Sequence, residues 1–249
     1  MKIKKILVSQ PKPDDNKSPY YELAKKYNLQ IDFRPFIQVE GVPVKEFRQS
    51  KINILDHTAL IFTSRTAVDH FFRVCTETRL TIPDSMKYFC ISESIAYYLQ
   101  KYIVYRKRKI FYGNRRFDEL LDTILKHKGE KFLLPMSNIH KQEIPEKLEK
   151  HNLAFTKAIF YRTVTSDLSD LSNVNYDVLV FFSPSGIKSL MQNFPDFKQK
   201  NTKIASFGPS TAKAVAEAGL KLDIKAPLPK APSMTMALEQ YIKTHNNVK

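Results

Sequence analysis

The chain has 249 residues, and its 40 Lys and Arg against 25 Asp and Glu give a formal net charge of +15. Hydrophobic residues make up 43% of the chain, which is enough for a buried core and excludes a wholly disordered protein. Its two cysteines, Cys75 and Cys90, are too few for a disulfide framework or a cysteine zinc site and fit a reducing compartment. No apolar run approaches the roughly 18 residues that a membrane helix needs. The first apolar stretch is too short for a signal peptide, so we expect a soluble cytoplasmic protein.

Short apolar runs alternate with amphipathic stretches along the chain. In chain order they predict a strand at 5–9, a helix at 20–27, a strand at 58–63, a helix at 67–74, a strand at 88–91, a helix at 94–101, a strand at 131–135, a helix at 144–151, a strand at 178–182, a helix at 187–192, a strand at 203–207, a helix at 211–218 that ends at Gly219, and a helix at 233–244. Strands that alternate with helices are typical of parallel sheets covered by helices on both faces. The sequence therefore predicts an α/β fold.

The sequence also contains an internal repeat. Residues 59–68 (ALIFTSRTAV) align with residues 178–187 (VLVFFSPSGI), and residues 90–96 (CISESIA) align with residues 206–212 (SFGPSTA). Each aligned segment is a strand, a turn that contains serine, and the start of a helix. The nearly constant shift between the two pairs predicts two similar α/β halves, with a chance alignment of common strand–turn–helix units as the alternative.

Two extended stretches, at 31–44 and 158–165, separate these halves. We interpret them as linker strands, at 34–44 and 158–168, through which the chain passes to a second domain and returns. This predicts a discontinuous domain one, from residues 1–33 and 169–249, and a domain two from residues 45–157. Two linker strands permit a hinge, and a cleft between the domains is then the default ligand site.

The sequence lacks the common catalytic signatures. It contains no glycine-rich nucleotide loop, no Gly-Lys-Ser/Thr phosphate loop and no nucleophile elbow. Its six histidines show neither zincin spacing nor pairing, and we interpret each as a solvated or capping residue. An enzyme built on this chain would therefore work without a metal, a nucleotide fingerprint or an evident carboxylate pair.

Serine- and threonine-rich turns follow three of the predicted strands. Ser64, the turn 183–186 and the turn 208–211 each precede a predicted helix. In an open parallel sheet, ligands bind at the carboxyl ends of the strands, and free amides at a helix N-terminus suit carboxylates or phosphates. The alternative for each turn is ordinary N-capping by the hydroxyl group. The net charge of +15 also favours a polyanionic partner. The alternative is that the excess of basic residues only keeps the surface soluble.

A basic segment at 101–116 contains seven Lys and Arg and no acid, with Tyr102, Tyr105, Phe111 and Tyr112 between them. Taken alone, this pattern is compatible with a nucleic-acid patch that stacks bases on its rings. It is equally compatible with an edge strand that charged side chains guard against pairing.

Taken in order, several segments resemble the uroporphyrinogen-III synthase family. They are residues 59–68, 133–138, 160–163 (FYRT), 176–187, 206–214 and 226–238. The resemblance implies two α/β domains joined by a two-stranded linker. It also implies a lyase of tetrapyrrole, porphyrin and haem biosynthesis that cyclises hydroxymethylbilane, a linear tetrapyrrole with many carboxylates, and inverts its last pyrrole ring. By the same resemblance the protein needs no cofactor or metal, binds neither nucleic acid nor membrane, and is a monomer.

The resemblance also implies site residues. Tyr161 would assist departure of the substrate hydroxyl group, because a phenol is protonated at neutral pH and can donate a hydrogen bond; the alternative is a half-buried linker tyrosine. Carboxylates would be bound, mostly through backbone amides, by Ser64, Ser137, Asn138, Ser183, Ser185, Gly186 and Thr211.

The turn at 92–95 (SESI) departs from the family, which often has Gly and Thr there, and its Glu93 disfavours an anion. A divergent, non-catalytic homologue that binds tetrapyrroles or other polyanions is therefore an alternative function. A nucleic-acid binder that uses residues 101–116 is a second alternative.

Overall fold

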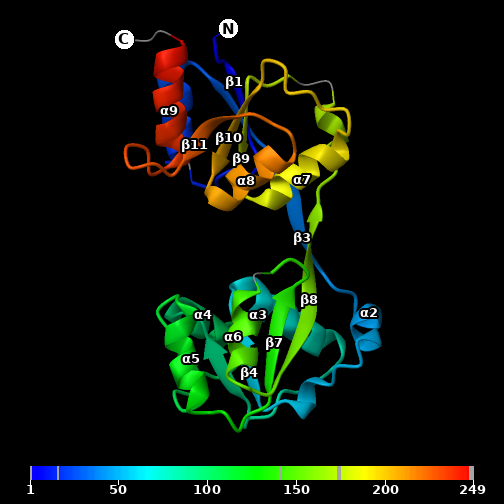
Figure 1. Cartoon of the computed structure of the whole chain (residues 1–249). Helices are drawn as coiled ribbons and strands as arrows, with labels where there is room; N and C mark the ends of the chain where they lie inside the picture. The colour runs from blue at the N-terminus through cyan, green and yellow to red at the C-terminus, as the bar shows by residue number, and fades with distance from the viewer. Residues whose placement is uncertain (1, 16, 141, 173–174, 247–249) are drawn as a thin grey trace. The chain divides into compact units, whose positions relative to one another are not determined.

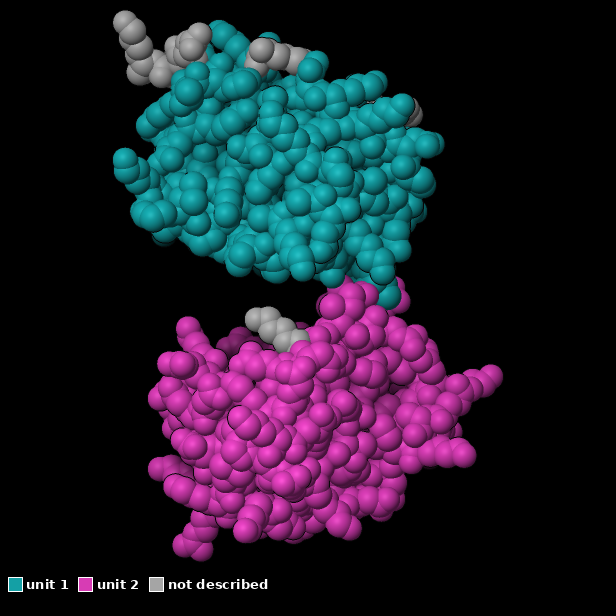
Figure 2. Space-filling view, viewed as in Figure 1, with its two compact units in different colours: residues 1–38, 164–249 teal, residues 39–163 magenta. Residues whose placement is uncertain are grey.

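The computed structural model describes residues 2–15, 17–140, 142–172 and 175–246. The chain forms two compact units, which Figure 2 colours separately. Unit 1 comprises residues 1–38 and 164–249, and unit 2 comprises residues 39–163. The chain thus crosses between the units at 38/39 and at 163/164, inside the two stretches that the sequence assigns to linkers.

Unit 1 is built on a five-stranded sheet with the order β11-β10-β9-β1-β2, in which every pair of neighbours is parallel. Its strands are β1 (Lys5–Val8), β2 (Gln30–Phe33), β9 (Val178–Phe181), β10 (Lys203–Phe207) and β11 (Leu222–Ala226). Its helices are α1 (Pro19–Tyr27), α7 (Pro184–Asn193), α8 (Pro209–Glu217) and α9 (Met234–His245), with a 3₁₀ turn at Ser169–Leu171. Alternate strand residues pack on opposite faces, so α1 and α9 cover one face of the sheet, and α7 and α8 cover the other (Figure 1).

Unit 2 is built on a six-stranded sheet with the order β3-β8-β7-β4-β5-β6. The strands are β3 (Ile37–Gly41), β4 (Ala59–Phe62), β5 (Lys87–Cys90), β6 (Ile110–Tyr112), β7 (Phe132–Ser137) and β8 (Phe155–Thr165), and those from β8 to β6 run parallel. Helices α2 (Val44–Gln49), α3 (Arg65–Glu77) and α4 (Glu93–Tyr98) pack on one face. Helices α5 (Phe117–Leu125) and α6 (Glu143–Lys150) pack on the other. Two 3₁₀ turns, Ile54–Asp56 and Leu99–Lys101, complete the unit.

The predicted α/β fold with two similar domains is confirmed, and the two sheets share one strand order. The series β6-β5-β4-β7-β8 in unit 2 corresponds to β11-β10-β9-β1-β2 in unit 1. The repeated segments of the sequence are therefore β4–α3 with β9–α7, and β5–α4 with β10–α8. Because β7 and β8 follow β4 to β6 in the chain whereas β1 and β2 precede β9 to β11, the two units are circular permutations of one topology.

Every predicted strand and helix is present within a few residues, but in the described part of the chain five strands and α-helices lie outside the predicted ones. Three of them, β2, β6 and β11, are outer or short strands whose residues are partly exposed, so they lack the continuous apolar run of a central strand. The other two are α2 and α5. β6 lies within the basic segment 101–116 at the end of the sheet order, as the edge-strand interpretation of that segment predicts.

The expected linker stretch at 158–168 begins inside the core of unit 2. Ala158 and Phe160 on β8 are 1% and 0% exposed, so this part of β8 is an ordinary buried strand. Both cysteines are free and lie in the same core, where burial raises the pKa of each thiol to about 12. Within the described ranges, no helix is both long and apolar enough to cross a membrane.

Candidate functional site

Three predicted site residues meet at the carboxyl edge of the sheet in unit 2. Ser64 follows β4, Ser137 ends β7 and Tyr161 lies on β8, and these three strands are neighbours. Ser137 pairs with Tyr161 in the β7–β8 register, and the Tyr161 hydroxyl lies 3.3 Å from Ser64 Oγ. The strand order thus gathers side chains that are 97 positions apart in the chain.

Ser64 serves two neighbours at once. Its Oγ accepts a hydrogen bond from the Ala67 amide at 3.0 Å and thereby caps α3. A serine hydroxyl has one proton and two lone pairs, so this Oγ can still donate its proton to the Tyr161 oxygen. In that arrangement the phenolic proton of Tyr161 remains available to a ligand.

His70, on α3, holds the Tyr161 ring from one side. The two rings stack with centroids 5.2 Å apart and an interplanar angle of 18°. Burial and then the nearby Arg73 guanidinium lower the pKa of His70, which favours the neutral imidazole. Arg73 Nε donates to His70 Nδ1 at 3.4 Å, so the ring proton resides on Nε2. The expectation that every histidine is a solvated or capping residue is therefore wrong for His70.

Asn138 fastens β7 to β8 beside this group. Its Oδ1 accepts hydrogen bonds from the Thr163 amide and from the Ser137 hydroxyl, both at 3.0 Å. Ser137 itself is buried and also accepts from the Ile139 amide at 3.3 Å. Asn138 is exposed, and its Nδ2 donates no hydrogen bond to any described residue, so this amide can reach a ligand.

Arg65 is a functional candidate that the sequence analysis missed. It is the first residue of α3, directly after Ser64, and it is exposed with its guanidinium carbon 5.2 Å from the Tyr98 ring centroid. A cation next to a helix N-terminus strengthens the positive potential there. The pattern that reveals it is the Ser-Arg pair that ends the strand–turn segment of the repeat.

The carboxyl edge of unit 1 gathers Ser183, Ser185 and Gly186. Ser183 Oγ accepts from the Gly186 amide at 3.2 Å and caps α7, as Ser64 caps α3. Ser185 is half-buried in the first turn of α7. A Cβ added to Gly186 would lie 3.2 Å from the Phe181 ring and 3.8 Å from Ser9 Oγ, so glycine allows the helix to approach β9 and β1 closely.

Ser9 is the second residue that the sequence analysis missed. It follows β1, which corresponds to β7 of unit 2 in the strand order, so Ser9 and Ser137 both lie at the carboxyl edge of their sheets. The pattern that identifies it is a serine followed by an amide side chain after a strand, Ser9-Gln10 in one unit and Ser137-Asn138 in the other. Recognition of this pair requires the permuted strand order.

The N-terminus of α8 differs from those of α3 and α7. Its N-cap, Gly208, adopts a φ of +88° and has no side chain, and Pro209 follows it. Among the described residues, no side chain caps the first turn of α8, so its amides remain available to an anion. Thr211 is fully buried, and its Oγ1 has no hydrogen-bond partner among the described residues. Thr211 therefore faces the sheet, and its backbone amide is the part that belongs to the open turn.

The equivalent turn of unit 2 carries an acidic residue. Ser92, the N-cap of α4, is buried and pairs with Asn114 in an isolated bridge. Glu93 then accepts a hydrogen bond from the Tyr112 hydroxyl at 3.1 Å. Glu93 thus gives the first turn of α4 a negative charge, which disfavours an anion there.

Comparisons with known proteins place this geometry in a family. The model of the family described as uroporphyrinogen-III synthase HemD matches residues 18–236. The uroporphyrinogen-III synthase of Saccharomyces cerevisiae (strain ATCC 204508 / S288c) is 26% identical over 140 residues, which are 50% of this chain and 50% of the yeast protein, so the match spans about half of that relative.

Solved structures agree with the fold over nearly the whole chain. The uroporphyrinogen-III synthetase of Helicobacter pylori 26695 is similar with a TM-score of 0.62 and 18% identity, over 98% of this chain and 100% of that one. A mutant uroporphyrinogen III synthase of the extremely thermophilic bacterium Thermus thermophilus is similar with a TM-score of 0.57 and 15% identity, over 97% and 100% of the two chains.

Proposed function

The chain belongs to the uroporphyrinogen-III synthase family, and from this membership we propose that it cyclises hydroxymethylbilane with inversion of the last pyrrole ring. The reaction makes it a water-eliminating lyase of tetrapyrrole biosynthesis. The observation that supports a catalytic role is the Tyr161 hydroxyl, hydrogen-bonded to Ser64 and stacked on a neutral His70 at a strand-end edge.

Tyr161 would act in the first step. The C–O bond of the hydroxymethyl group breaks as the adjacent pyrrole supplies an electron pair, and the hydroxide takes a proton from the Tyr161 hydroxyl to leave as water. Ser64 then donates its own proton to the phenolate in a hydrogen bond, which stabilises the charge that forms. The pyrrole loses its N–H proton and becomes an azafulvene, and the phenolate is available to take that proton back.

The later steps require orientation of the substrate. The substituted carbon of the last ring attacks the azafulvene carbon, and the spirocyclic intermediate reopens and closes with the ring inverted. Holding flexible reactants in one geometry supplies several kcal/mol toward such a step. No acid or base beyond Tyr161 is needed, which fits the proposed absence of a cofactor.

Backbone amides and a few cations would bind the substrate carboxylates. The uncapped first turn of α8 supplies amides in unit 1, and the Asn138 amide and the Arg65 guanidinium supply donors in unit 2. The hydroxyls of Ser64 and Ser183 already accept from their own helices, so these side chains position the turns. The net charge of +15 raises the local concentration of a substrate with many carboxylates.

The test uses enzymatically generated hydroxymethylbilane and the isomer composition of the cyclised product. We expect the inverted isomer from the native chain, and a fall in kcat of about 10²-fold with little change in KM for Tyr161→Phe. Tyr241→Phe is a matched control, because Tyr241 also stacks on a histidine, His245, with centroids 5.0 Å apart. If the native chain produces the non-inverted isomer alone, the proposed function is refuted. An unchanged kcat in Tyr161→Phe would refute the role of its hydroxyl.

A second candidate is a non-catalytic binder of tetrapyrroles or other polyanions on the same scaffold. The first turn of α4 favours it, because Glu93 gives that turn a negative charge that disfavours a substrate carboxylate. Tight binding of a cyclic tetrapyrrole without cyclisation of hydroxymethylbilane would establish this second function.

A further inference from the structure

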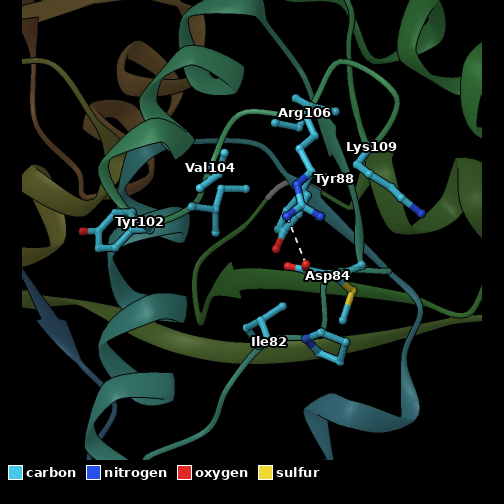
Figure 3. Close-up of a pocket in the computed structure, with 11 residues that line it drawn as sticks. Ile82, Asp84, Tyr88, Tyr102, Val104, Arg106 and Lys109 are labelled. Carbon is cyan, nitrogen blue, oxygen red and sulfur yellow. Dashed lines mark hydrogen bonds and ion pairs between the residues drawn. The ribbon is translucent and has the colours of Figure 1, made fainter.

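Unit 2 contains a cavity that lies away from the candidate site. It has a volume of about 220 Å³, and Figure 3 shows the residues that line it. They come from the segments that precede β5 and β6 and from the first residues of these strands. The strands of this sheet from β8 to β6 are parallel, so the cavity is at their amino ends, whereas Ser64 and Tyr161 are at the opposite, carboxyl edge.

Tyr88 contributes a hydroxyl to this cavity. The residue is 5% exposed, and its hydroxyl has no hydrogen bond to any residue in the described ranges. The neighbouring tyrosines differ, because the hydroxyls of Tyr98 and Tyr102 both bond to Asp69. A hydroxyl that lines a cavity and has no protein partner is free to donate to a ligand there. Burial and the nearby Asp84 also raise the pKa of Tyr88, so the group remains a donor.

The rim of the cavity is positively charged. Arg106 pairs with Asp84 at 3.0 Å, and Lys109 Nζ donates to the Ser85 carbonyl at 3.3 Å. Two cations therefore face one carboxylate at the rim. The next residues, Lys107 and Arg108, are exposed and form no ion pair with a described residue, so they add to the positive potential.

The floor of the cavity is apolar and its volume is small. Ile82, Met86 and Ile103 supply aliphatic surface beside the Tyr102 ring, whose hydroxyl points away from the cavity in Figure 3. A volume of about 220 Å³ equals that of about seven liquid waters at ~30 Å³ each. It lies below the roughly 300–1,000 Å³ of sites for drug-sized ligands. A single substituted ring fits this volume, and a tetrapyrrole does not.

We propose that this cavity binds a small organic anion, consisting of one apolar or aromatic ring with a carboxylate or phosphate group. The ring packs on the apolar floor, and the acidic group accepts hydrogen bonds from Tyr88, Arg106 and Lys109. The cavity is then a second ligand site, distinct in chemistry and in position from the edge that carries Tyr161.

The test uses phenylacetate and phenyl phosphate as probes and phenylacetamide as the neutral analogue, in titrations of the whole chain followed by amide chemical shifts. We expect shifts at Tyr88, Ile103 and Lys109, and binding of phenylacetamide at least ~10-fold weaker than that of phenylacetate. The tighter of the two anions identifies the acidic group of the ligand. Tyr88→Phe should weaken that anion about 3- to 10-fold, and Arg106→Gln about 10-fold or more.

Arg108→Gln is the matched control, because Arg108 carries the same charge in the same loop but does not line the cavity. It should leave the dissociation constant within about twofold, since an exposed charge acts only weakly at a distance. The proposal is overturned if neither anion binds at a concentration of ~10 mM. This concentration is well above the weakest Kd that a specific small ligand should show. The proposal is also overturned if the shifts map to Ser64 and Tyr161, or if the three variants bind alike. None of these outcomes depends on cyclisation of hydroxymethylbilane.

Discussion

The two roles of Ser64 can be separated by one pair of variants. Ser64 Oγ accepts a hydrogen bond from the Ala67 amide at 3.0 Å, which caps α3, and lies 3.3 Å from the Tyr161 hydroxyl. Ser64→Ala removes both interactions. Ser233→Ala removes a comparable cap, because Ser233 Oγ accepts from the Met236 amide at 3.2 Å at the start of α9. Ser233 Oγ also lies 3.1 Å from Thr235 Oγ1, so each variant loses one cap and one side-chain hydrogen bond, and only Ser64→Ala loses a bond to the phenol.

The expected magnitudes follow from these contacts. Loss of a serine N-cap costs about 1 kcal/mol of unfolding free energy, so both variants should unfold at a slightly lower urea concentration. The bond to Tyr161 is a single hydrogen bond, which is worth roughly 1 kcal/mol. Because it strengthens as the phenol loses its proton, its loss should lower kcat about 5- to 10-fold in Ser64→Ala only.

The assay combines urea unfolding with steady-state cyclisation of hydroxymethylbilane at a temperature where both variants remain folded. Equal kcat values for Ser64→Ala and Ser233→Ala would refute the hydrogen-bonded pair as part of the catalytic group. A loss of stability in Ser233→Ala but not in Ser64→Ala would instead refute the capping role of Ser64.

Two further predictions concern stability. Burial lowers the pKa of both His70 and His127 below the value of about 6.5 for an unfolded histidine. As the pH falls, the unfolded state therefore binds protons before the folded state does. The free energy of unfolding should then decrease as the pH drops from about 6.5 toward the folded pKa values. The measurement is urea unfolding of a His70→Gln/His127→Gln variant between pH 7.5 and 5.5. Its free energy of unfolding should depend less on pH than that of the native chain, and an unchanged pH dependence would contradict the prediction. Gly208→Ala should cost about 1–2 kcal/mol because its φ of +88° strains an L-residue although no atom lies within 4 Å of the added Cβ. The same substitution at Gly129, where the Cβ also has open space and no positive φ is present, should be nearly neutral, and equal losses at the two positions would show that backbone strain is not the cause.

The central strands are predictable from the sequence because both faces of a parallel sheet are covered. All four residues of β4 and all four of β9 are buried, so both strands appear as continuous apolar runs. An outer strand such as β6 has only three residues, of which one is buried, and it lies in a segment of basic residues. Its assignment as a strand therefore depends on β5 beside it, which a local pattern does not reveal.

The members of the candidate site are partly predictable, but their contacts are not. Ser64 and Ser183 follow apolar strands, so the sequence indicates both as caps or anion contacts. The contact between Ser64 and Tyr161 arises because β7 lies between β4 and β8 in the sheet, an order that differs from the order in the chain. The stacking of His70 on Tyr161 has the same origin, since α3 must first be placed against β8.

The shared strand order also shows where the two units differ. Ser183 at the edge of unit 1 corresponds to Ser64 in unit 2, so the serine that caps the helix is duplicated. The phenol is not duplicated, because residues 34–38 (RPFIQ), which follow β2, the strand that corresponds to β8, contain no tyrosine. The guanidinium of Arg34 donates to the Asp167 carbonyl at 2.9 Å and to the Asp170 carboxylate at 3.1 Å.

The charge at the two equivalent helix starts also differs between the units. Within the described part of the chain, neither first turn has a side-chain cap, but that of α4 in unit 2 contains Glu93, whereas that of α8 in unit 1 contains no acid. A turn with free amides favours a carboxylate, and a turn that already holds one repels it. Duplication of one scaffold therefore supports a division in which unit 2 supplies the proton donor and unit 1 the stronger backbone site for substrate carboxylates. On this division, substitutions at Tyr161 should act mainly on kcat and substitutions at Gly208 mainly on KM.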